Sequence, residues 1–127
     1  MYGPARAALL LGLLWAGWHL PLFLFRGWSS SPLWAYFAIV TSLSVIMTFG
    51  HNLSRGSVLV AVLLHDVFNS AGAPLHLFLD GAARRGHFDE IVAGSFLIGA
   101  AALIVATRGC LGQSPELGPN GEDYTVE

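Results

Sequence analysis

Three polar side chains suited to acid–base chemistry or metal binding lie inside apolar runs of the sequence. His65 and Asn69 interrupt the run VLVAVLLHDVFNSAGAP at residues 58–74, and His19 interrupts another run at residues 7–25. A spacing of four residues puts His65 and Asn69 on one face of a helix. Lipid offers no hydrogen bonds to such groups, so polar residues within a spanning segment mark a functional site by default. We therefore expect these three residues to form a site.

Small residues accompany both histidines on their helix faces. Gly12 and Ala16 share the face of His19, and Ala61 shares the face of His65. Faces of this kind let two helices approach closely. We expect the two segments to pack face to face, so that both imidazoles and the nearby amide meet in one cavity reached by water. The plainer alternative is that each histidine only bonds a backbone carbonyl of a neighbouring helix.

Pro21 follows His19 closely and should disturb the first helix. A proline has no N–H and clashes with the carbonyl four residues earlier, here that of Gly17. We expect a kink near that carbonyl. Trp15, one turn before His19, would add a bulky wall to the pocket.

The composition identifies the class of protein. Of the 127 residues, 54% are hydrophobic and 11% are charged, against about 25% charged in soluble domains, and the mean hydropathy is +0.62. These values predict an integral membrane protein in contact with lipid. The six cations, all arginine, form no basic stripe, which excludes a nucleic-acid partner. Cys110 is the single cysteine, so the chain has no disulfide framework, and we expect this thiol to be structurally inert.

Four apolar segments of near-membrane length predict an all-α fold, a polytopic transmembrane bundle of about four spanning helices. The segments comprise residues 7–25, 32–49, 58–74 and 91–107. They form one membrane core over residues 1–108. Residues 109–127 are rich in glycine, proline and acids, so we expect a disordered polar tail.

The other histidines fall beside predicted connections between these helices. His51 lies in the connection at 50–57, and His76 and His87 lie in the longer connection at 75–90. Each has a charged or turn-forming residue nearby. We expect all three to be exposed to solvent.

Two motifs together resemble those of a known family. WAGWHLPLF at residues 15–23 places an aromatic residue four positions before His19, and HDVFN at residues 65–69 has the form His-x-x-x-Asn. In this order, in neighbouring hydrophobic segments, they are similar to the second and third motifs of the CPBP family, the CAAX-protease and bacteriocin-processing proteins. The aromatic here is Trp15, where the family most often has Phe.

The resemblance implies an intramembrane endopeptidase, a metal-dependent hydrolase in a bacterial cell membrane acting on a peptide or protein substrate. His19, His65 and Asn69 would be the catalytic residues. They would hold the attacking water, a divalent metal such as zinc bound by His19 and His65, or the developing oxyanion. In the family, a glutamate of a preceding motif, Glu-Glu-x-x-x-Arg, activates the water.

That first motif does not occur in these 127 residues. We therefore expect an N-terminally truncated member of the family, which in this exact chain could be an inactive fragment. Asp66 cannot easily replace the glutamate, because it lies about 100° around the helix from His65. Two histidines also fall short of the three protein ligands usual for catalytic zinc.

Two other classes of protein fit the same residues. A small transporter or proton relay would use His19, His65 and Asp66, since such groups mark proton pathways in membranes. A non-catalytic membrane protein, such as an immunity or scaffold subunit, would use them only to hold helices together.

Overall fold

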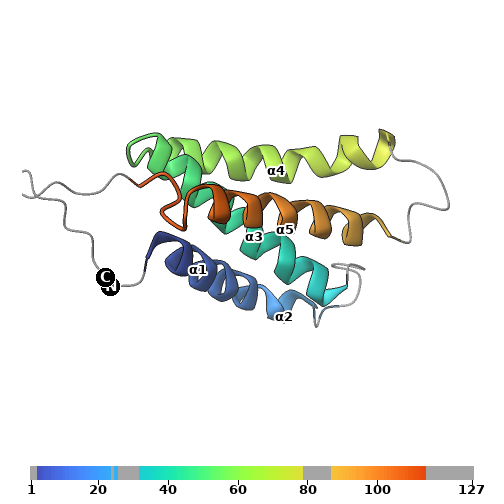
Figure 1. Ribbon diagram of the computed structural model, residues 1–127. Coiled ribbons are helices and arrows are strands. Elements are labelled where there is room, and N and C mark those ends of the chain that lie inside the picture. The colour runs from blue at the N-terminus through green and yellow to red at the C-terminus, as the bar shows by residue number, and fades with distance from the viewer. Residues whose placement is uncertain (1–2, 24, 26–31, 79–86, 114–127) are drawn as a thin grey trace, which may run out of the picture.

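The described part of the chain is all-helical, as predicted. The computed structural model describes residues 3–23, 25, 32–78 and 87–113, with the backbone alone for 72–78. Figure 1 shows the helices side by side along one direction. Their bounds are α1 (Pro4–Trp18), α2 (Leu20–Phe23), α3 (Leu33–Leu53), α4 (Val58–Phe78) and α5 (Phe88–Ala106).

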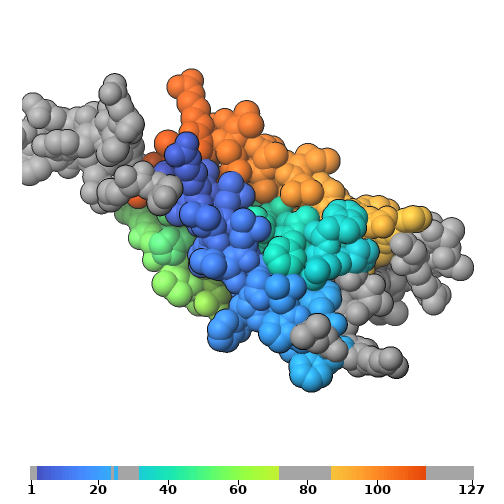
Figure 2. Space-filling view, turned by 90° about the horizontal axis from the view of Figure 1, so that it is seen from below, coloured from blue at the N-terminus to red at the C-terminus, as the bar shows by residue number. Residues whose placement is uncertain are grey.

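Helix α3 is the central element of the bundle. It packs against α1 most extensively, then against α5 and α4. Figure 2 shows α1 in front of α3, with α4 along one side of α1 and α5 along the other. The buried residues of α3 include Val45, which is fully buried, and the hydroxyl-bearing Ser42 and Ser44. Each of the other long helices is therefore positioned by its own contact with α3.

The small-residue face of α1 is a packing face, but its main partner is α3. Gly12 lies so close to α3 that a Cβ there would stand 2.7 Å from the Cα of Thr41. One turn earlier, the Ser44 hydroxyl donates a 2.9 Å hydrogen bond to the carbonyl of Ala8. The expected face-to-face packing of the His19 and His65 segments is thus replaced by packing of each on α3. A hydroxyl that bonds across helices strengthens the α1–α3 contact.

Several helix ends differ from the sequence-based expectation. The first segment breaks at His19, between α1 and α2, two residues before Pro21, consistent with the expected disturbance. Helix α3 continues four residues past the predicted limit and ends at Leu53; Arg55 (φ 57°) and Gly56 (φ 86°) follow in the left-handed region. Helix α4 continues through Pro74 to Phe78, since apolar helices tolerate an internal proline.

The chain after α5 folds back onto the bundle. Leu111 is fully buried and belongs to one cluster with Ala8, Val45 and Ala100. The amide of Asn52 donates to the Leu111 carbonyl at 3.0 Å. The predicted disordered tail is therefore wrong for residues 109–113; residues 114–127 lie outside the described part.

This turn also joins the start of α1 to the segment that follows α5. The N–H of Ala5 donates to the carbonyl of Gly109 at 3.1 Å. Leu111 has φ 45°, a left-handed conformation that is strained for a branched side chain. Burial and its hydrogen bonds to Asn52 and to the Thr107 hydroxyl offset this strain.

Large apolar side chains cover the outside of the bundle. Leu14 and Trp18 on α1 are 74% and 82% exposed, and Ile98 and Val105 on α5 are 73% and 77% exposed. Within the described residues, α3 and α5 are long and apolar enough to cross a membrane by length and composition, and Val58–Ala71 is a shorter apolar helix.

A side chain at Gly12 should separate α1 from α3. We expect Gly12→Ala to lower the free energy of unfolding by about 1–3 kcal/mol, because its Cβ overlaps backbone that cannot give way. Gly99→Ala is the matched control. Its Cβ meets nothing within 4 Å, so the better helix propensity of alanine should make it neutral or stabilising by up to about 1 kcal/mol. Thermal unfolding in detergent micelles, followed by circular dichroism, checks both. Equal stability of the two variants would contradict the close approach.

Removing the buried side chain of the C-terminal turn should loosen the bundle. Leu111→Ala should cost about 2–5 kcal/mol, because it empties a filled site between α1, α3 and α5. The control is Leu14→Ala, which removes the same atoms from a side chain that is 74% exposed and should change stability by less than about 0.5 kcal/mol. Unfolding curves of both variants provide the measurement. If the Leu111→Ala variant were as stable as the control, the turn would contribute nothing to the free energy of unfolding.

Candidate functional site

Trp15 contacts the rings of both motif histidines. Its ring centroid lies 5.4 Å from that of His65 on α4 and 6.5 Å from that of His19 at the end of α1. His19 also meets the ring of Tyr36 on α3, edge-on at 6.1 Å. Residues far apart in the sequence therefore lie on one side of the bundle, joined by a shared aromatic ring.

The hydrogen bond of His19 fixes which ring nitrogen carries the proton. Nδ1 lies 2.9 Å from the carbonyl oxygen of Trp15, and a carbonyl only accepts, so Nδ1–H is the donor. In the neutral ring, Nε2 then presents a lone pair. The residue caps α1, with φ −88° and ψ −5°, and sits where the helix breaks before Pro21. The break thus sets the position of an imidazole whose Nε2 can accept a proton.

His65 and Asn69 interact with each other one turn apart on α4. The Asn69 amide nitrogen lies 3.3 Å from Nε2 of His65. An amide nitrogen only donates, so Nε2 accepts and the neutral ring carries its proton on Nδ1. The motif His-x-x-x-Asn therefore has a physical basis here, because the asparagine selects the histidine tautomer.

The predicted residues are only partly brought together. His19 and His65 are half-buried, whereas Asn69 is exposed, and so is Asp66 beside it. Both histidines bond within their own helices, so neither ties two helices together by a hydrogen bond. A cavity lies beside His19 and His65, but neither of these two histidines lines it.

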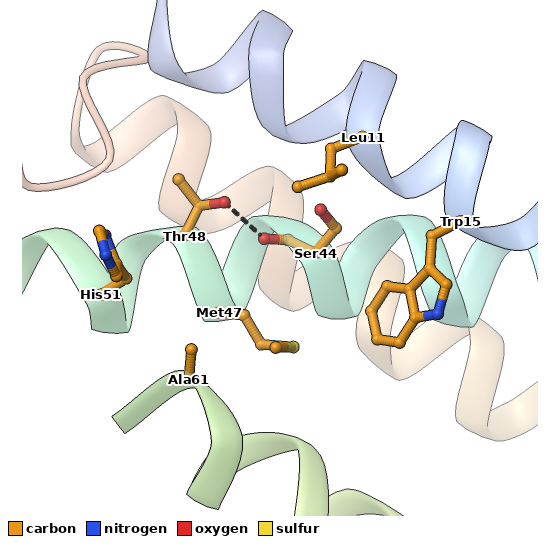
Figure 3. A pocket seen from close by; sticks show the side chains of 7 residues that line it. All are labelled: Leu11, Trp15, Ser44, Met47, Thr48, His51 and Ala61. Carbon is orange, nitrogen blue, oxygen red and sulfur yellow. Dashed lines mark hydrogen bonds between the residues drawn. The ribbon is translucent and has the colours of Figure 1, made fainter. Parts of the chain in front are cut away.

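This cavity, of about 250 Å³, opens between α1, α3 and α4. In Figure 3, α3 runs along the cavity between α1 and α4, Trp15 projects into the cavity from α1, and Ala61 lines it from α4. Its lining residues are Leu11, Trp15, Ser44, Met47, Thr48, His51 and Ala61. Trp15, predicted as a pocket residue, belongs to both this cavity and the histidine contacts.

His51 is the residue that the sequence analysis placed differently. It was expected in an exposed loop, but α3 extends past it, and the half-buried ring lines the cavity. Its Nδ1–H points to the Asn52 side-chain oxygen at 3.5 Å. The spacing of Ser44, Thr48 and His51 at intervals of four and three residues could have revealed this shared face.

The other two histidines differ. The His87 ring is exposed, as expected, and lies 2.6 Å from the Glu90 carboxylate. His76 was predicted in a loop, but the backbone there is part of α4; its side chain lies outside the described residues.

The described residues do not fit a catalytic zinc centre. Among them, no group of three His, Cys, Asp or Glu side chains could hold a metal ion, whereas catalytic zinc takes three protein ligands. Asn69 already bonds Nε2 of His65. No step through a metal is therefore derived from these residues.

No family model matches the chain, and no curated protein and no solved structure matches it either.

Replacing Asn69 should release the tautomer of His65. With Asn69→Leu, the neutral ring loses its donor at Nε2 and should shift toward the ordinary Nε2–H form. Nitrogen NMR of histidine-labelled protein, at a pH where the imidazole is neutral, distinguishes the two tautomers. The free energy of unfolding should change by less than about 1.5 kcal/mol, because the bond between Asn69 and His65 is exposed and a typical intramolecular hydrogen bond contributes about 0.5–1.5 kcal/mol. His19, bonded to a backbone carbonyl, is the internal control and should not change. An unaltered His65 spectrum would contradict the assigned role of Asn69.

Proposed function

We propose that the chain is a membrane-embedded bundle with four spanning segments, α1 with α2, α3, α4 and α5. The exposed leucines, isoleucines and valines on its outer faces support this, because soluble monomers rarely expose contiguous apolar patches beyond a few hundred Å². The 21 residues of α3 extend about 30 Å, the thickness of the hydrocarbon core. The same faces would be stable against acyl chains.

Within this membrane protein we propose hydrolysis of a peptide bond, as in the CPBP family that the motifs resemble. The observation that carries the proposal is the shared contact of His19 and His65 with Trp15. His19 lies one helical turn after Trp15, so the contact that joins the two motifs is the one that His65 on α4 makes with the same ring. Their hydrogen bonds within their own helices argue against a purely helix-locking role.

In this proposal, His19 and His65 have different tasks. The lone pair on Nε2 of His19 accepts a hydrogen bond from the attacking water and holds that water in place, while a carboxylate base takes the water's proton and passes it to the leaving amine. His65 and Asn69 donate hydrogen bonds to the carbonyl oxygen as it gains negative charge, the usual source of the largest rate gain. This requires the Asn69 amide to turn from His65 toward the substrate.

The reaction also needs a carboxylate base, which we propose comes from outside these 127 residues. The sequence has no Glu-Glu-x-x-x-Arg. Asp66 is exposed beside the site, and Glu90 is bonded to His87. The base would belong to another segment or another chain.

Removing either imidazole should abolish hydrolysis while leaving the fold intact. We expect His19→Ala and His65→Ala to lower peptide cleavage by at least about 100-fold, the lower range of acid–base catalysis. The assay uses the protein in proteoliposomes together with the segment or chain that supplies the carboxylate. Mass spectrometry of membrane-peptide digests measures cleavage. His87→Ala is the control, since that ring is exposed and bonded to Glu90.

Two results would contradict the proposal. One is that the unsubstituted protein, supplied with the carboxylate, cleaves no peptide. The other is that both histidine variants cleave at the original rate. Large losses of thermal stability in both variants, without any activity to lose, would instead support the immunity or scaffold alternative. Proton-driven flux in liposomes would support the transporter.

A further inference from the structure

The cavity beside the histidines has walls that suit an apolar group. Its hydroxyl donors are already used: Ser44 donates to the carbonyl of Ala8, and Thr48 donates to the carbonyl of Ser44 at 2.8 Å. The remaining walls are aliphatic, thioether and aromatic, apart from His51 at one end (Figure 3). Away from His51, a polar occupant would lose its hydration without meeting a free hydroxyl donor.

The size and opening of the cavity limit the occupant further. A dry apolar cavity of about 150 Å³ holds a benzene molecule, so about 250 Å³ accommodates one large side chain. Leu11, on the wall contributed by α1, is 60% exposed. The cavity is therefore open to a segment that approaches from the side of the bundle.

Trp15 joins this cavity to the histidine site. The same ring that lines the cavity lies 5.4 Å from the His65 ring. A side chain seated against Trp15 would therefore touch a ring that also contacts His65. Because Trp15 belongs to both places, the side chain held in the cavity would influence which peptide bond of the segment lies near the imidazoles.

We propose that this cavity is a specificity site that takes one large apolar side chain, such as phenylalanine or leucine, of a peptide segment whose adjacent bond lies at His19 and His65. The position of the peptide bond at His19 and His65 rests on the proposed hydrolytic function, whereas the binding of an apolar side chain in the cavity does not depend on it. Ala61 and Met47 set the room available, and Trp15 supplies the contact face.

Cysteine protection tests the occupant without relying on cleavage. Cys110 is free and exposed, so Ala61→Cys is made in a Cys110→Ser background and treated with methyl methanethiosulfonate in micelles. The probes are a blocked alanine peptide with one central phenylalanine and the same peptide with alanine throughout. We expect the phenylalanine peptide to slow the reaction at least about tenfold, since apolar pockets discriminate by such factors, and the alanine peptide to have little effect. Val62→Cys, 47% exposed and outside the cavity, is the control and should not be protected.

Two protection results would overturn the assignment. One is equal protection by both peptides, or by neither. The other is a reaction at Ala61→Cys that is already much slower than at the control cysteine in micelles without peptide and is not slowed further by the phenylalanine peptide, which would identify an acyl chain as the occupant. Cleavage of the same peptides, measured with the protein together with the segment or chain that supplies the carboxylate, separates the two proposals. Protection without cleavage removes the hydrolysis and keeps the site, whereas cleavage without selective protection removes the site and keeps the hydrolysis.

Discussion

The backbones of α1 and α3 approach at Gly12 so closely that a side chain there would overlap Thr41. This approach lets the Ser44 hydroxyl reach the carbonyl of Ala8. Because α3 also carries α4 and α5, its contact with α1 determines where the ends of α1 lie relative to the other helices. The position of Trp15, three residues beyond Gly12, follows from the same contact.

The central position of α3 explains why the histidines meet at an indole ring. With α3 as the main neighbour of both α1 and α4, the small-residue faces of those helices do not pack on each other, and the ring that both imidazoles contact is Trp15. The long side chain of Trp15 extends across the gap to His65. The remaining space beside it, over Met47 and next to Ala61, is the cavity. One helix in the middle thus accounts for both the aromatic contact and the open volume.

Periodicity and composition predicted the helices and the packing face of α1, because these depend on local patterns. They did not predict the partner of that face. Gly12 and Ala16 would fit any helix with a compatible surface, and the cross-helix bond of Ser44 is indistinguishable in sequence from the local bond that Thr48 makes.

The site shows the same division between local and long-range information. The pairing of His65 with Asn69 follows from a spacing of four residues. The role of His51 in the cavity depended on where α3 ends, which sequence patterns define poorly. The burial of Leu111 depends on contacts with residues more than fifty positions away, so glycine and proline content alone suggested a disordered tail there.

The C-terminal turn has a consequence for how the protein is made. Leu111 fills a space against Ala8, and Gly109 accepts the N–H of Ala5, so α1 gains these neighbours only after the chain has been synthesised through Leu111. In the proposed membrane bundle, α1 would lie in the bilayer until then with part of its packing surface unmatched. Closure of this surface would come late, and a machinery that inserts segments one by one would have to keep α1 close to α3 until the turn at residues 109–113 arrives.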